Sequence, residues 1–208
     1  MIDNYYKDEF GVIHQKDYEL FTYDAKYSVD RYDSIKDSVE AMSLLRLGFI
    51  INTLKWGPIS ILDVGYGNGS FISMCSKIFR RCYCNDVSDY PVPEGVEFIE
   101  DITSKHFEVI TFFDSLEHME DIDIIGRLKC DYVIVSVPYC SYKSDEWFEK
   151  WKHRRPNEHL HHFNIESIIN FFDYYNFKLI NSGFVEDAIR KSDEEHNILT
   201  VAFKKEDS

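Results

Sequence analysis

The chain lacks any long apolar run. No stretch approaches the roughly 20 apolar residues that a helix needs to cross a bilayer. The first residues, MIDNYYKDEF, have neither the basic start nor the apolar segment of a secretory signal. We therefore expect no membrane partner and a cytoplasmic location.

Basic residues are scarce relative to acidic ones. The 208 residues include 23 Lys and Arg against 37 Asp and Glu, so the formal net charge is −14. Binding to nucleic acid depends on Lys and Arg that displace counterions from phosphates, and anionic membranes attract the same residues. The balance argues against duplex nucleic acid as a partner.

Cysteine is sparse, and its five residues are an odd number. Three of them lie in or beside apolar stretches, which suits free thiols in a reducing compartment. Strand alternation would put the sulfurs of Cys82 and Cys84 on one face, but no second cysteine pair follows at zinc-site spacing. We therefore predict no bound metal.

The composition does supply a core, since 44% of the residues are hydrophobic and 16% are aromatic. The length fits a single domain, residues 1–208. Within it we expect an N-terminal lid and helix over 1–57 and a ligand-binding core over 58–208. Residues 1–35 contain no clear periodic element, although their many aromatic residues favour a lid over a floppy tail.

Hydrophobic periodicity then predicts alternating helices and strands. Strands are expected at 61–64, 81–86, 96–99, 107–113, 131–137, 177–185 and 198–203. Helices are expected at 37–54, 71–79, 119–128 and after the N-cap residue Asn164. Such alternation indicates an α/β fold with a doubly wound, mostly parallel seven-stranded sheet. The last two strands have no helix between them and should form an antiparallel hairpin at its edge.

Glycines cluster where the first strand ends. The segment Asp63-Val64-Gly65-Tyr66-Gly67-Asn68-Gly69-Ser70 has the spacing G-x-G-x-G, with Ser70 where the dinucleotide fingerprint has its third glycine. Open α/β sheets bind ligands at the carboxyl ends of their strands, so this loop is a candidate site, with a helix-packing turn as the alternative. The Asp63 carboxylate suits a ligand with positive charge better than a pyrophosphate.

A second acid, Asp86, ends the next strand. It lies about 20 residues past the first glycine, where a carboxylate accepts hydrogen bonds from ribose hydroxyls. By itself Asp86 is equally consistent with a turn residue. Together with the glycine loop it is a candidate ribose ligand.

The ordered motifs resemble those of class I S-adenosylmethionine-dependent methyltransferases from about residue 59 to residue 203. They are the glycine loop, Asp86, Asp101-Ile102 and Phe113-Asp114-Ser115-Leu116-Glu117-His118. The Glu-His pair and the later His159-Leu160-His161-His162-Phe163-Asn164 are similar to a small-molecule subgroup with a His-Leu-x-x-Phe motif. The resemblance implies a Rossmann-like fold with S-adenosylmethionine as the cofactor.

The resemblance also assigns contacts to the methionine part of the cofactor. Gly65, Gly67 and Gly69 would let the backbone pass it closely, and Asp63 would lie near its ammonium group. Tyr66 departs from the small or Cys-like residue that is common there, and it would narrow the loop.

The remaining cofactor contacts fall on three later segments. Asp86 would hold the ribose, and Asp101 would accept from the adenine amino group beside the Ile102 backbone. Asp114 would lie near the sulfonium. A cationic cofactor in a cleft lined by carboxylates is electrostatically favourable.

Histidine and glutamate supply candidate catalytic groups. His118 follows the fourth strand and should face the cleft, where an imidazole takes a proton near neutral pH. A local hydrogen bond at a helix start is the alternative for His118, and Glu117 has the same two interpretations. His159 is the third catalytic candidate.

Four of the eight histidines fall between residues 153 and 162. Three interpretations stay open: a metal site of His159, His161 and Glu158, an acceptor-binding loop, or a polar loop. An extended stretch would pair His159 with His161 on one face and leave His162 alone.

The only dense basic run precedes these histidines. We assign Arg154 and Arg155, with His161 and His162, to acceptor binding, because arginine forks match carboxylate or phosphate groups. A solvated basic face is the alternative.

The sequence thus predicts methyl transfer to a small-molecule acceptor, with an anionic group as an option. The alternatives are an S-adenosylmethionine-binding protein without catalysis, a nicotinamide-dependent oxidoreductase, and a nucleic-acid or protein methyltransferase. Ser70 and Asp63 disfavour the oxidoreductase. No Asn-Pro-Pro-Tyr-type motif follows the fourth strand, which disfavours the last alternative.

Deletion of residues 1–35 is expected to abolish turnover and to leave cofactor affinity largely intact, because the lid covers the acceptor rather than the cofactor. Turnover assays and cofactor titration of the truncated chain check this. Normal turnover by the truncated protein would contradict the lid.

Overall fold

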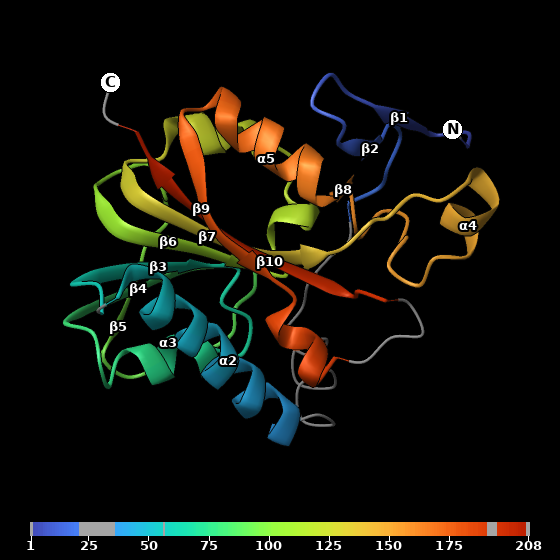
Figure 1. Ribbon diagram of the computed structural model, residues 1–208. Coiled ribbons are helices and arrows are strands. Elements are labelled where there is room, and N and C mark those ends of the chain that lie inside the picture. Colours follow the sequence, from blue (N-terminus) through green and yellow to red (C-terminus); the bar gives the residue numbers. More distant parts are fainter. Residues whose placement is uncertain (1, 21–35, 56, 191–194, 207–208) are drawn as a thin grey trace.

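The computed structural model describes residues 2–20, 36–55, 57–190 and 195–206. Within these ranges, seven strands form one sheet in the order β5-β4-β3-β6-β7-β10-β9, seen in the middle of Figure 1. They are β3 (Ser60–Val64), β4 (Arg81–Asn85), β5 (Val96–Phe98), β6 (Phe107–Phe113), β7 (Cys130–Pro138), β9 (Phe177–Gly183) and β10 (Ile198–Lys205). Strands β3 to β7 pair in parallel, and β10 runs antiparallel to β7 and β9. The predicted α/β fold and its antiparallel edge hairpin are confirmed.

The central strands are buried on both faces. Every residue of β7 from Val133 to Pro138 is buried, and so is every residue of β6 from Val109 to Phe113. A strand covered on both sides needs no polar alternation. These continuous apolar runs therefore require helices on the two faces of the sheet.

Three helices supply that cover: α2 (Lys36–Leu54), α3 (Ser70–Cys75) and α5 (Ile165–Tyr174). The short α4 (Asp145–Lys150) packs instead beside the N-terminal residues, where its Phe148 shares an apolar cluster with Tyr5 and Ile13. Figure 1 shows α2 and α3 on one face of the sheet and α5 on the other. Ile50 of α2 and Ile72 of α3 belong to one apolar cluster, whereas Phe172 of α5 stacks on Phe203 of β10 with 4.2 Å between ring centroids. None of the described helices is both long and apolar enough to cross a membrane.

Helix α5 begins as the sequence predicts. The Asn164 side chain accepts a hydrogen bond from the Ser167 N–H at 2.8 Å, and the Ser167 hydroxyl accepts one from the Asn164 N–H at 3.0 Å. This reciprocal cap satisfies two backbone donors that the first helical turn leaves without partners.

The N-terminal region contains regular structure that periodicity does not reveal. Strands β1 (Tyr5–Lys7) and β2 (Ile13–Gln15) form a hairpin, and β2 pairs with β8 (His161–His162) in a separate three-stranded sheet. The Asp8 carboxylate closes the turn by accepting from the N–H groups of Phe10 and Val12 at 3.0 and 2.7 Å. Strands of two or three residues are too short for a period-2 signal. The lid aromatics Phe21, Tyr23, Tyr27 and Tyr32 lie outside the described residues.

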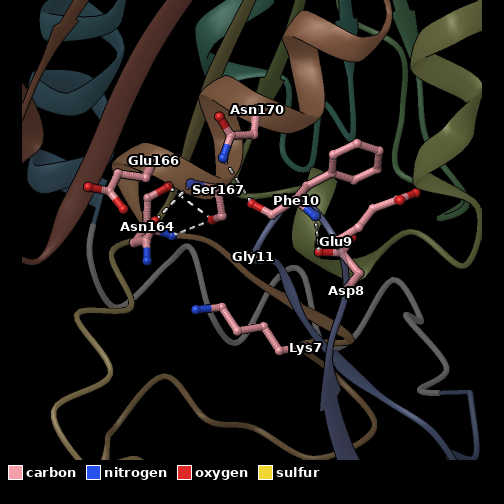
Figure 2. A pocket seen from close by; sticks show the side chains of 9 residues that line it. All are labelled: Lys7, Asp8, Glu9, Phe10, Gly11, Asn164, Glu166, Ser167 and Asn170. Carbon is pink, nitrogen blue, oxygen red and sulfur yellow. Dashed lines mark hydrogen bonds between the residues drawn. The ribbon is translucent and has the colours of Figure 1, made fainter.

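Polar side chains line a pocket of about 290 Å³ where this hairpin docks on α5 (Figure 2). The lining residues are Lys7, Asp8, Glu9, Phe10, Gly11, Asn164, Glu166, Ser167 and Asn170. In Figure 2 the Asn170 amide points to the Phe10 backbone, and it donates a hydrogen bond to the Phe10 carbonyl at 3.3 Å. The pocket contains none of the residues that the sequence proposes for a cofactor or an acceptor.

Two predicted helices are shorter than the periodicity suggests. Helix α3 ends at Cys75 rather than at residue 79, and the segment 119–128 is not an α-helix. Instead, 3-10 turns η1 (Leu116–His118) and η2 (Ile122–Arg127) follow β6. The Tyr175 ring lies 2.5 Å from where a Cβ of Gly126 would be, so tertiary packing against α5 governs this turn.

Replacing Phe172 with alanine is expected to lower the free energy of unfolding by about 3–5 kcal/mol, because it removes a buried ring and its stacking on Phe203. The matched control is Ile78→Ala, at a side chain that is 57% exposed. It should change the free energy of unfolding by no more than about 0.5 kcal/mol. Chemical denaturation measures both. Equal losses would contradict the assignment of Phe172 to the core.

Candidate active site

The glycine loop follows β3 and is packed too tightly for side chains at two positions. Gly65 and Gly69 have φ angles of 77° and 75°. A Cβ on Gly65 would lie 2.5 Å from the Ser115 Cβ, and one on Gly69 would lie 2.4 Å from the Pro93 Cγ. Both contacts are closer than real Cβ atoms come. Glycine therefore brings the loop against η1 on one side and the segment after β4 on the other.

Asp63 lies on β3, just before the loop, and is 3% exposed. The Thr111 hydroxyl donates a hydrogen bond to its carboxylate at 2.7 Å. Burial raises the pKa of Asp63 to about 6, and the Thr111 hydrogen bond opposes this rise. A cation beside Asp63 would relieve the cost of burying its charge.

Asp86 holds the glycine loop against the end of β4. One carboxylate oxygen accepts from the Gly67 N–H at 2.8 Å, and the other accepts from the Ser88 N–H at 2.8 Å. An ionised carboxylate has about four acceptor sites, so these two bonds leave capacity for a ligand. These two hydrogen bonds fix the orientation of the Asp86 carboxylate, which is the group predicted to bind a ribose.

Tyr66 turns into the protein rather than standing free in the loop. Its ring is 5% exposed and packs in the apolar cluster beneath α2 and α3. Its hydroxyl donates a hydrogen bond to the Tyr90 carbonyl. Tyr66 therefore ties the segment after β4 to the glycine loop.

The predicted adenine contacts lie in the loop after β5. Asp101 is exposed and accepts from both the N–H and the hydroxyl of Thr103, at 2.8 and 2.7 Å. The hydrogen bond from the Thr103 hydroxyl lowers the pKa of Asp101. Ile102 is buried, with 5% of its surface exposed. Asp101 thus keeps its charge in solvent beside a structured turn, and its contact with adenine stays a prediction.

Asp114 belongs to a partly buried network of four charged side chains that no local sequence pattern indicates. Arg46 of α2 donates to Asp114 at 2.6 Å and to Glu186 at 2.8 Å. Arg190 donates to the two carboxylates at 2.6 and 3.0 Å. The pKa of Asp114 is well below its usual range, since the charges of Arg190 and Arg46 outweigh the opposing effect of burial.

The sequence places Asp114 beside a sulfonium, yet its charge is balanced by two guanidinium groups before any cofactor binds. The one signal for this network is Arg46, a charge between Leu45 and Leu47 on an otherwise apolar stretch of the helix. The partners of Arg46 are Asp114 and Glu186, which lie 68 and 140 positions further along the chain. Local sequence patterns cannot predict contacts over such separations.

The three predicted catalytic residues do come together. Glu117 and His159 are 1% and 4% exposed, and the ring centroids of His118 and His159 are 4.6 Å apart. The nearest Glu117 oxygen lies 3.9 Å from the His118 Nε2. One donor atom from each of the three lies within 4.8 Å of the other two. The backbone N–H of Leu160 donates to the Glu117 carbonyl at 2.8 Å and joins the two segments.

His161 and His162 point to opposite sides of β8, and both are buried. His161 lies opposite His14 in the β2–β8 pairing, and their Nδ1 atoms are 2.8 Å apart. The ring of His159 instead has the rings of His118, His153 and His162 as neighbours. The predicted pairing of His159 with His161 therefore fails, because it assumes an extended stretch over these residues, whereas β8 contains only residues 161 and 162. Burial lowers the pKa of His161 to about 4 and that of His162 to about 3.

The predicted anion-binding arginines have protein partners. Arg155 donates to Glu158 at 2.9 Å, and the Arg154 guanidinium lies 5.8 Å from the centroid of the Tyr5 ring. The Arg154 Nε is buried and has no hydrogen-bond partner among the described residues. Arg154 is therefore the better placed of the two to take an anionic ligand.

The sheet order, the glycine loop and the acids at the strand ends define a Rossmann-like class of ligand-binding fold. A family model described as a methyltransferase domain matches residues 35–182. The chain belongs to this methyltransferase-domain family. A comparison with curated protein sequences gave no match.

Solved structures of methyltransferases share the fold of this chain. Magnesium protoporphyrin IX methyltransferase from Synechocystis, with bound S-adenosylhomocysteine, aligns over 84% of this chain and 86% of its own, with 14% identity and a TM-score of 0.61. The 1,6-didemethyltoxoflavin-N1-methyltransferase of Burkholderia thailandensis aligns over 98% and 100%, with 14% identity and a TM-score of 0.58.

A third similar structure is a [4+2]-cyclase, SpnF, with 12% identity and a TM-score of 0.58 over 92% of this chain and 100% of its own. Its name describes a reaction other than methyl transfer. The fold is therefore shared among different chemistries, and the reaction has to be argued from the site.

The affinity for S-adenosylmethionine is expected to rise with pH up to about 6. Burial raises the pKa of Asp63 to about 6, so below that pH a cationic ligand must displace the proton of the Asp63 carboxyl group. The affinity then falls by up to about tenfold for each pH unit below 6. Asp63→Asn should bind more weakly and lose this pH dependence, whereas the exposed control Asp89→Asn should keep it. Calorimetric titration between pH 5 and 7.5 measures the effect, and a flat wild-type profile would contradict it.

Proposed function

We propose that this chain transfers a methyl group from S-adenosylmethionine to a small-molecule acceptor. The observation that carries the proposal is the glycine loop with Asp63 and Asp86 at the adjacent carboxyl ends of β3 and β4. The Asp63 carboxylate suits a cofactor with an ammonium and a sulfonium better than one with a pyrophosphate. The Asp86 carboxylate suits a ribose, which both kinds of cofactor carry.

The residues of this loop fit the cofactor. Gly65 and Gly69 adopt positive φ angles and let the loop turn tightly at the end of β3. Asp86 is already oriented by the Gly67 and Ser88 N–H groups, and a ribose would use its remaining acceptor sites. Bound there, S-adenosylmethionine supplies a methyl group activated by its cationic sulfur.

The acceptor would lie on the side of the loop where η1 and residues 153–162 meet. Glu117, His118 and His159 gather there, and the β1–β2 hairpin backs the same segment through β8. The protein's task is to align the acceptor with the methyl group and to exclude water. An acceptor with an anionic group would pair with Arg154. We also propose that the chain is one domain in which residues 1–57 form a lid and a helix and residues 58–208 form the cofactor-binding core.

Calorimetry with S-adenosylmethionine, S-adenosylhomocysteine and NAD tests the cofactor. The first two should bind with one site per chain, and NAD should not bind. Asp86→Asn should weaken both by about tenfold, which is the loss of about 1.4 kcal/mol expected for a hydrogen bond to a charged group. The exposed Asp89→Asn is the matched control and should bind like the wild type.

A panel of small hydroxyl-, amine- and carbon-acid acceptors with a methyl-labelled cofactor then tests the reaction. Transfer of the label to a panel member supports the proposal. Binding of NAD in place of S-adenosylmethionine would refute it. Tight cofactor binding without turnover on any panel member would favour a cofactor-binding protein that does not transfer methyl groups.

A further inference from the structure

We propose that Glu117, His118 and His159 bind a divalent transition-metal ion whose open positions take a hydroxyl oxygen of the acceptor. The acceptor part rests on the proposed function, whereas the metal site stands on the three side chains alone. Their donor atoms all lie within 4.8 Å of one another. Metal–ligand bonds of about 2.1 Å put neighbouring ligand atoms roughly 3.0–3.4 Å apart, so small side-chain rotations complete the site.

His118 is held in the form that a metal requires. Its Nδ1 lies 2.6 Å from the Glu158 carbonyl, and since a carbonyl only accepts, Nδ1 carries the proton. The other nitrogen, Nε2, then has a lone pair and is the one that lies 3.9 Å from Glu117. A histidine that donates its second N–H to a backbone carbonyl is the usual arrangement behind a metal ligand.

His159 is buried, with 4% of its surface exposed, and its ring centroid lies 4.6 Å from that of His118. Within the described part of the chain its Nδ1 is a buried atom without a hydrogen-bond partner. A buried polar atom of this kind calls for a ligand, a water or an ion.

Glu117 supplies the negative charge, and its carboxylate is almost completely removed from solvent. A buried carboxylate is strongly stabilised by a coordinated cation. The cluster also adjoins the cofactor loop, because Ser115, two residues before Glu117, packs on Gly65 and donates to the Val64 carbonyl at 2.6 Å.

The donor set selects the kind of metal. Two imidazoles and one carboxylate suit Zn²⁺, Fe²⁺ or Ni²⁺ better than Mg²⁺ or Ca²⁺, which prefer oxygen ligands. Three protein ligands leave at least one coordination position for a small ligand. His161 does not belong to this set, since its ring nitrogens lie 2.8 Å from His14 and from the Met119 carbonyl.

The open position gives the site a chemical role. A hydroxyl bound to the metal loses its proton to water more readily, because the cation stabilises the alkoxide. The alkoxide oxygen then forms a bond with the methyl carbon. The carbon–sulfur bond breaks, and its electron pair stays on the sulfur, which leaves the neutral thioether S-adenosylhomocysteine and a methyl ether. The acceptor atom would therefore be oxygen.

Titration of the chelator-treated full chain with ZnCl₂ tests the metal site. The wild type should bind one Zn²⁺ per chain, and Glu117→Gln and His159→Asn should weaken binding by about 10- to 100-fold. Glu117→Asp, which keeps a carboxylate, should bind more tightly than Glu117→Gln. The matched control is His106→Gln, an exposed histidine that lies 3.1 Å from Asp131, and it should bind like the wild type.

Each variant is also titrated with S-adenosylhomocysteine, because binding of this ligand shows that the variant is folded. Equal Zn²⁺ affinity in the wild type, Glu117→Gln and His159→Asn would overturn the metal site, as would the absence of one-to-one binding to the wild type. If Zn²⁺ binds as expected but S-adenosylhomocysteine does not, the metal site stands and the proposed function fails.

Catechol, a simple pair of adjacent hydroxyls, probes the open position. The visible spectrum of the Co²⁺-loaded wild type should change when catechol is added, and His159→Asn treated in the same way should show no such change. An unchanged wild-type spectrum would overturn the binding of a hydroxyl at the metal.

Discussion

The ion pairs of Asp114 with Arg46 and Arg190 hold together the elements on which the rest of the site depends. It joins α2, the end of β6 and the segment after β9 at one point. Asp114 has a φ angle of 54°, a conformation that a non-glycine residue keeps only where its surroundings enforce it. From this turn the chain runs directly into η1, so Ser115 meets Gly65 and Glu117 faces His159. Two acidic and two basic side chains from distant parts of the chain thus hold the turn that leads into η1.

The order of strands and helices could be predicted because β6 and β7 are apolar on both faces and because Asn164 is a strong helix cap. The N-terminal hairpin could not, since its strands have three residues each. The segment 119–128 was misjudged for a related reason. Its apolar spacing is compatible with a helix, whereas the chain forms a 3-10 turn over 122–127 in which Gly126 packs closely on the Tyr175 ring.

The sequence could suggest which residues belong to the candidate active site, but it could not predict how they lie relative to one another. Each of Glu117, His118 and His159 is a plausible base by its chemistry, but their meeting depends on the Leu160 N–H that bonds to the Glu117 carbonyl. The pairing of His159 with His161 assumes an extended stretch, whereas β8 contains only His161 and His162, and His161 contacts His14 of β2. Local spacing cannot report a partner that arrives from the other end of the chain.

That distant partner has a consequence for how the molecule is made. The segment from β3 to β4 pairs within residues 60–85, so the cofactor loop can form soon after it leaves the ribosome. His14 meets His161 across 147 positions, and the first hairpin must wait for that segment at a synthesis rate of about 5–20 residues per second. The β1–β2 hairpin therefore reaches its place later than the cofactor loop, although it is synthesised earlier.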